Sequence, residues 1–122
     1  MSTRENISSG SKWEPILGYS RAVKVGNYIH VSGTTGPGAT APEQTKAALK
    51  IIQEALEKGG AKISDVVRTR VYVTDISQWE AIGKVHGEVF GEIKPAMAMV
   101  EVSKLIDPAL LVEIEADAYI GA

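Results

Sequence analysis

Five segments of the chain carry the alternating, β-branched side-chain pattern of β-strands, and this pattern limits the fold more than any other feature. The longest such run, residues 66–74, is rich in valine and threonine. Gly26-Asn27 separates two others and is typical of a two-residue β-hairpin turn. The sequence therefore predicts strands at residues 20–25, 28–32, 66–74, 97–103 and 110–119.

Two further segments repeat apolar residues at helical spacing. Residues 42–58 begin with a proline, which suits a first helical turn, and end before Gly59-Gly60, which suits a helix end. In residues 77–90, Ser77 and Glu80 form a capping-box pattern. The order β-β-α-β-α-β-β predicts a mixed sheet with both helices on one face, in a single α/β domain spanning residues 1–122.

Because strand side chains alternate between faces, each predicted strand divides into two sets. One set is aliphatic and is expected beneath the helices: Val23, Val25, Ile29, Val31, Val67, Val71, Val73, Val100, Val102, Val112, Ile114 and Ala116. The other set mixes charges with large apolar groups: His30, Ser32, Arg68, Arg70, Tyr72, Met97, Met99, Glu101, Leu111, Glu113, Glu115 and Tyr119. This mixture fits a subunit interface or a pocket, although a solvated sheet face is the simpler alternative.

The composition narrows the function classes. The chain has no cysteine, which excludes disulfides and thiolate chemistry and favours a cytoplasmic location. No signal peptide or apolar stretch of about 18 residues is visible, so no membrane association is expected. The net charge of −2 argues against nucleic acid as a partner. The two histidines lack metal-ligand spacing, and no metal site is predicted.

Two glutamates, Glu113 and Glu115, share the mixed face of the last strand. Two carboxylates on one face repel unless a cation or a proton intervenes. Pairing with Arg68 and Arg70 is one interpretation. The other is that one glutamate is partly buried, with a raised pKa, and orients or deprotonates a water molecule.

The chain resembles the RidA/YjgF/UK114 family of reactive-intermediate deaminases over nearly its whole length. Three stretches carry the resemblance: GYSRAVKVGNYIHVSG at 18–33, ISDVVRTRVYVTD at 63–75, and PAMAMVEVSKLIDPALLVEIEADA at 95–118. The resemblance implies a chorismate-mutase-like α/β fold in a homotrimer with three clefts between subunits. It also implies hydrolysis of a small-molecule imine or enamine to a ketone and ammonia, with no cofactor.

The same resemblance assigns roles to individual positions. Glu113 matches the glutamate that holds the attacking water, and Tyr19 matches the tyrosine that closes the cleft. Ser32 and Gly33 match the serine-glycine pair that lines it. The peptide around Met99 matches the segment whose backbone contacts substrate and water.

The sequence departs from the family pattern at Met97, where the best-known deaminases have an arginine that grips the substrate carboxylate. Methionine cannot make those bonds, so we expect a substrate other than 2-iminopropanoate, with Met97 and Met99 lining a more apolar cleft. Arg70 or Arg21 could supply a displaced cation. A non-catalytic, metabolite-binding or regulatory trimer is the alternative function, and an endoribonuclease acting on translation is a third.

Overall fold

The computed structural model describes residues 3–122. Its secondary structure consists of β1 (Arg4–Ile7), α1 (Trp13–Leu17), β2 (Ala22–Val25), β3 (Tyr28–Thr34), α2 (Ala41–Lys58), η1 (Ile63–Asp65), β4 (Val66–Val73), η2 (Ile76–Gln78), α3 (Trp79–Phe90), β5 (Ala96–Glu101) and β6 (Val112–Tyr119). The two η elements are single turns of 3₁₀-helix.

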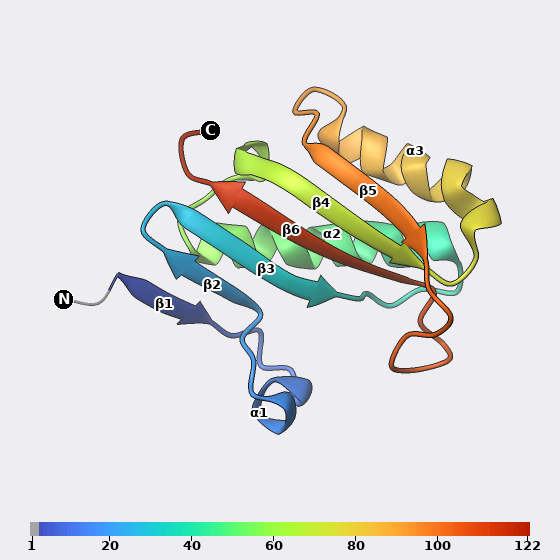
Figure 1. Cartoon of the computed structure of the whole chain (residues 1–122), viewed down its shortest axis with the longest axis horizontal. Coiled ribbons are helices and arrows are strands. Elements are labelled where there is room, and N and C mark those ends of the chain that lie inside the picture. The colour runs from blue at the N-terminus through green and yellow to red at the C-terminus, as the bar shows by residue number, and fades with distance from the viewer. Residues whose placement is uncertain (1–2) are drawn as a thin grey trace.

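All six strands form one sheet in the order β1-β2-β3-β6-β4-β5 (Figure 1). Only β4 and β5 are parallel, and α3 connects them; every other neighbouring pair is antiparallel. In the view of Figure 1 the sheet lies in front and α2 passes behind its central strands. The predicted mixed sheet with both long helices on one face is therefore confirmed.

The core lies between this sheet and the long helices. Ile52 and Leu56 of α2 are fully buried, as are Val71 of β4 and Ile114 of β6. Each such side chain contributes roughly 1.5–3 kcal/mol of transfer free energy. This packing makes the sheet a rigid support, so the residues on its opposite face are held in place by the backbone beneath them.

The helix and hairpin boundaries follow the expected local chemistry with one exception. Gly26 has a φ of 59° in the β2–β3 turn, and Gly60 has a φ of 83° just beyond α2, so both use the left-handed freedom of glycine. The predicted capping box at Ser77 is wrong. Its hydroxyl and amide both donate to Oδ1 of Asp75, at 2.6 and 3.0 Å, so Asp75 caps the start of η2 and Ser77 does not cap α3.

The face assigned to β5 is also wrong. In the parallel register with β4, Met97 lies beside buried Thr69 and Met99 beside buried Val71. Residues paired across neighbouring strands share a face. The methionines therefore lie on the helix side of the sheet, and Val100 lies on the uncovered side, where it is exposed.

Three further departures come from the outer parts of the sheet. Val23 and Val25, expected in the core, pair with His30 and Tyr28 and so lie on the uncovered face, where Val25 is exposed. A register shift between Val66 and Arg68 turns Val67 outward, so Val66 takes its expected place in the core. Strand β1 and helix α1 have no counterpart among the predicted elements. Both are short, and β1 has one buried residue, Ile7, which gives too weak a pattern for prediction.

Candidate functional site

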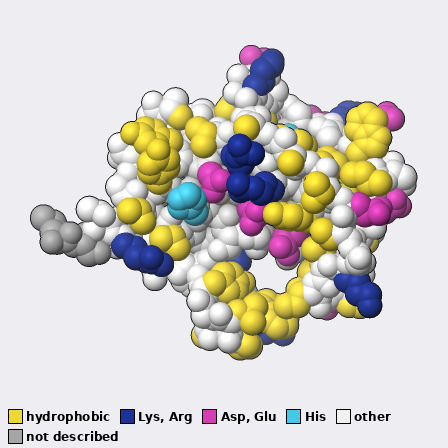
Figure 2. All heavy atoms as spheres, in the orientation of Figure 1, with side chains coloured by type: hydrophobic (Ala, Val, Ile, Leu, Met, Phe, Trp, Pro, Cys, Tyr) yellow, Lys and Arg dark blue, Asp and Glu magenta, His cyan; other side chains and the backbone are white. Residues whose placement is uncertain are grey.

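A groove of about 1020 Å³ lies between α1 and the segment 104–110 that precedes β6, and it extends from Glu113 of β6 to Ile51 of α2. Figure 2 shows the hollow, with apolar side chains on its α1 side and acidic groups near the sheet. Five of the predicted site residues line it together: Tyr19, Arg21, Ser32, Gly33 and Glu113. Met97, Met99 and Arg70 do not.

A bulge in β3 builds the floor of this groove. The β3–β6 register shifts between Val31 and Thr34, both of which are buried, and leaves Ser32 and Gly33 as the irregular residues between them. Bulges re-aim side chains and bend the strand locally. Here the bulge presents the Ser32-Gly33 backbone to the groove.

Glu113 crosses directly over Gly33. A Cβ atom placed on Gly33 would collide with Oε2 of Glu113 and lie 3.0 Å from its Cδ. The φ of Gly33 is not in the left-handed region, so glycine is needed here for space and not for backbone conformation. The absence of a side chain at Gly33 therefore determines where the Glu113 carboxylate lies.

The environment of Glu113 favours its protonated form. Burial raises the pKa of Glu113 above its usual value, and the negative charge of Glu115 raises it further, while the positive charge of Arg21 opposes both. Among residues 3–122, no hydrogen bond is made to the Glu113 carboxylate. Its oxygens are therefore available to a water molecule or ligand in the groove, and its pKa moves toward the range of a general base.

Arg21 organises the residues around Glu113. Its side chain is 7% exposed, and Nη1 donates to the carbonyl oxygen of Gly33 and to Oγ1 of Thr34, both at 3.0 Å. Nη2 donates to the hydroxyl of Tyr19 at 3.1 Å. The guanidinium thus holds the bulge and the tyrosine in one arrangement, and its bonds are directed to the protein and not to the groove.

Arg70 also pairs with side chains of the protein. Its Nη1 donates to Oδ2 of Asp117 at 3.2 Å and lies 3.8 Å from Oε1 of Glu115. The hydroxyl of Tyr72 donates to the same Glu115 oxygen at 2.7 Å. The predicted pairing of Arg70 with Glu115 is confirmed, and Glu113 is left without such a partner.

The walls of the groove are formed by residues that the sequence pattern did not predict. Lys12, Trp13 and Leu17 line it from the α1 side, and Lys104 and Ile106 line it from the opposite segment. The salt bridges found within residues 3–122 include neither Lys12 nor Lys104. One signal for the α1 wall was present in the sequence. The stretch WEPIL comes immediately before Gly18 and Tyr19, so it places apolar side chains next to Tyr19, a predicted cleft residue.

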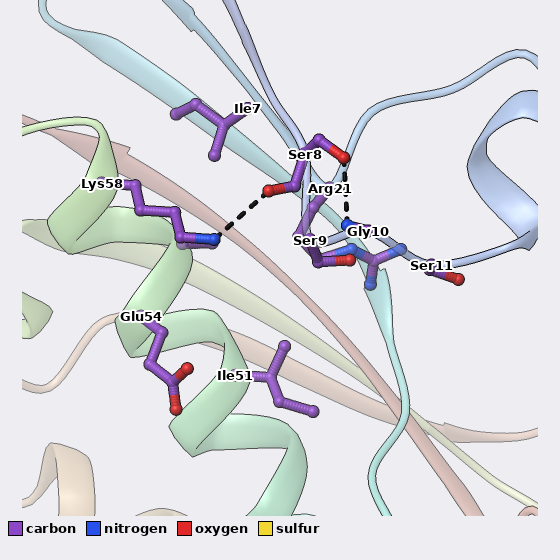
Figure 3. A pocket seen from close by; sticks show the side chains of 10 residues that line it. Ile7, Ser8, Ser9, Gly10, Ser11, Arg21, Ile51, Glu54 and Lys58 are labelled. Carbon is purple, nitrogen blue, oxygen red and sulfur yellow. Dashed lines mark hydrogen bonds between the residues drawn. The ribbon is translucent and has the colours of Figure 1, made fainter.

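A second cavity, of about 340 Å³, lies behind Arg21, between the loop 8–11 and α2 (Figure 3). Lys58 of α2 donates to the carbonyl oxygen of Ser8 at 3.3 Å, and the Gly10 amide donates to the Ser8 hydroxyl at 3.0 Å. These bonds tie the loop that leads into α1 to the body of the domain. The side chain of Arg21 lines both cavities.

No group of three or more acidic or histidine side chains suited to a metal ion occurs within residues 3–122. Over the same range, no helix combines the length and apolar character needed to cross a membrane.

Comparison with known proteins identifies the family to which this chain and its fold belong. The family model described as "Endoribonuclease L-PSP" matches residues 10–120. A crystal structure from Mycobacterium tuberculosis, described as a member of the YjgF/YER057c/UK114 family, is 56% identical, with a TM-score of 0.95. The match covers 96% of this chain and 99% of that one.

Two curated relatives agree with this result. A RutC family protein of Pyrococcus abyssi is 42% identical over 95% of this chain and 97% of its own length. A protein of Dermatophagoides farinae named 2-iminobutanoate/2-iminopropanoate deaminase is 34% identical, over 94% of this chain and 95% of its own. The chain belongs to the RidA/YjgF/UK114 family.

Proposed function

We propose that this protein is a cofactor-independent hydrolase that converts a reactive imine or enamine to a carbonyl compound and ammonia. The observation that carries the proposal is the Glu113 carboxylate, which is partly buried, has a raised pKa and faces the groove without a hydrogen bond from residues 3–122. The relative named as a deaminase supports the same reaction class.

In the proposed reaction, Glu113 accepts a proton from water while the water oxygen bonds to the imine carbon. The electron pair of the C=N π bond moves to nitrogen, which takes the proton back from Glu113. The resulting carbinolamine transfers its hydroxyl proton to nitrogen by way of the same carboxylate. The C–N bond then breaks, and the carbonyl compound and ammonia leave.

The hydroxyl groups of Tyr19 and Ser32 are oriented to bind the substrate. The Tyr19 oxygen already accepts a bond from Arg21, so its own proton is free to be donated into the groove. The Ser32 hydroxyl donates to the carbonyl oxygen of Ser20 at 2.6 Å, so its lone pairs are free to accept. We assign Tyr19 to an electronegative atom of the substrate and Ser32 to an N–H group.

The substrate carboxylate needs a cation that is not already paired. Arg70 and Arg21 bond to protein groups, whereas Lys12 and Lys104 line the groove outside any salt bridge found within residues 3–122. We propose that Lys12 and Lys104 bind the substrate carboxylate. Their ammonium groups are flexible point charges, so this contact is less directional than an arginine fork.

We also propose that the protein acts as a cytoplasmic homotrimer, as its family resemblance implies. Apolar side chains such as Tyr28 and Val100 are exposed between the charges of the uncovered sheet face, as expected of a surface that another copy covers. In such an assembly Met97 and Met99 could reach a cleft only from a neighbouring copy, because they lie outside the groove of their own chain.

The test is ammonia release from imines generated in the assay by an amino-acid oxidase. We expect Glu113→Gln to lower kcat/KM by about 10²–10⁴-fold, while Glu88→Gln, an exposed change on α3, leaves it unchanged. Equal activity of wild type and Glu113→Gln would remove the assigned role. Binding of 2-oxo acids without any catalysis would favour the non-catalytic alternative.

A further inference from the structure

Helix α1 buries its charge and exposes its apolar side chains. Glu14 is its one buried residue, whereas Ile16 and Leu17 are 68% and 61% exposed. A surface helix ordinarily does the reverse. The apolar side of α1 is therefore not used for packing within the chain.

The position of α1 is nevertheless well defined. Its acidic residue Glu14 accepts bonds from the amide and hydroxyl of Ser9, at 3.1 and 2.5 Å. At the other end, the amides of Gly18 and Tyr19 donate to the Glu14 carbonyl at 2.8 and 3.0 Å. These bonds hold the helix by its polar groups and turn Trp13 and Leu17 toward the groove.

The opposite wall of the groove also carries apolar side chains. Leu105, Ile106 and Leu110 line the groove from the segment before β6, and Ile106 is 60% exposed. The Lys12 ammonium lies 5.2 Å from the centre of the Trp13 ring, which it helps to orient. The groove thus has a polar floor at Glu113 and two facing walls, on which apolar side chains lie beside Lys12 and Lys104.

We propose that these walls bind the side chain of the substrate, and that the protein selects imines of amino acids with branched or aromatic apolar side chains. This inference rests on the proposed function and specifies its substrate class. A three-carbon imino acid bound at Glu113 carries only a methyl group, which leaves most of the apolar surface of both walls without contact. A substrate with a polar head at Glu113 and an apolar side chain between the walls matches both surfaces.

The preference has a predictable size. Each methylene group moved from water to an apolar wall strengthens binding by about fourfold. A leucine-derived imine has three more carbons than an alanine-derived one. Because the groove is open on one side and buries them incompletely, we expect kcat/KM to be about tenfold higher for the leucine-derived imine.

Two neighbouring residues of α1 provide a matched pair of variants. Leu17 lines the groove and Ile16 does not, although both are exposed to a similar extent. We expect Leu17→Ala to reduce the leucine-to-alanine preference about threefold or more, mainly through KM, and Ile16→Ala to leave it unchanged. Ile106→Ala, on the opposite wall, is expected to act like Leu17→Ala.

Calorimetric titration separates this inference from the proposed function. If wild type hydrolyses neither imine, the proposed function fails, and tighter binding of 4-methyl-2-oxopentanoate than of 2-oxopropanoate still supports the apolar walls. Equal kcat/KM for the two imines, or equal effects of Leu17→Ala and Ile16→Ala, would overturn the inference. So would a change in oligomeric state on sedimentation of Leu17→Ala, because the wall would then be an interface between copies.

Discussion

Replacing Gly33 by alanine separates the stability of the fold from the position of the Glu113 carboxylate. The added Cβ meets the end of the Glu113 side chain, at 3.0 Å from Cδ and 3.3 Å from Cγ. Ordinary carbon contacts begin near 3.5 Å, so the carboxyl group must move by roughly 0.5–1 Å. A flexible side chain does this by leaving its preferred rotamer, at a cost of about 0.5–1.5 kcal/mol.

The gain from removing a strand glycine offsets about 0.5–1 kcal/mol of that cost, so we expect Gly33→Ala to change the free energy of unfolding by less than about 1 kcal/mol. Activity should respond far more strongly. A displacement of about 1 Å in a reacting group lowers the rate by roughly 10²-fold. Urea unfolding and ammonia release on the same preparation measure the two effects.

Gly36→Ala is the matched control. Its Cβ would lie 2.6 Å from the amide nitrogen of Ala48 and 2.8 Å from the carbonyl carbon of Ala47, both in the backbone of α2. A helix backbone cannot rotate aside, so we expect a loss of about 1–3 kcal/mol or more. The reasoning is refuted if Gly33→Ala keeps full activity, or if it destabilises the protein as much as Gly36→Ala does.

Three further predictions concern stability and binding. His86 is buried against Phe90, and burial lowers its pKa in the folded protein. In the unfolded chain its pKa is about 6.5. As the pH falls below that value, the unfolded state takes up a proton more readily than the folded state, so the free energy of unfolding decreases. Urea unfolding between pH 5 and 7.5 measures that slope, which His86→Gln should lack. Gly87 lies within α3, and a Cβ atom placed on it would meet open space, so Gly87→Ala should raise the unfolding free energy by about 0.8–1 kcal/mol in the same assay. Lys104→Met should raise KM for an anionic imine by about twofold to fivefold, with kcat little changed, and the effect should shrink as salt is added.

The fold was predictable because most strands have one plainly aliphatic face. Strand β5 was not, since Met97 and Met99 alternate with Ala98 and Val100, and both sets are apolar. The alternation of side chains along β5 then defines two faces, but it does not indicate which of them is buried against the helices. Only the parallel register with β4, a long-range pairing, places the methionines on the helix side.

The floor of the site was predictable, and its walls were not. Glu113 and Gly33 come from motifs in the sequence, and the structure brings them into contact. The role of Arg21 depends on a β-bulge, which alternation does not show. Helix α1 was missed because it has five residues and buries a glutamate, the reverse of the pattern by which helices are found.

The pH dependence of kcat/KM in wild type and Glu115→Gln tests whether Glu113 is the catalytic base. If Glu113 must be ionised to activate water, kcat/KM rises with pH along a limb set by its raised pKa. Glu115→Gln removes a negative charge that contributes to that shift, so the limb should move toward lower pH for the same imine. A limb that stays in place, or a rate with no acidic limb, would contradict the assignment of Glu113 as the catalytic base.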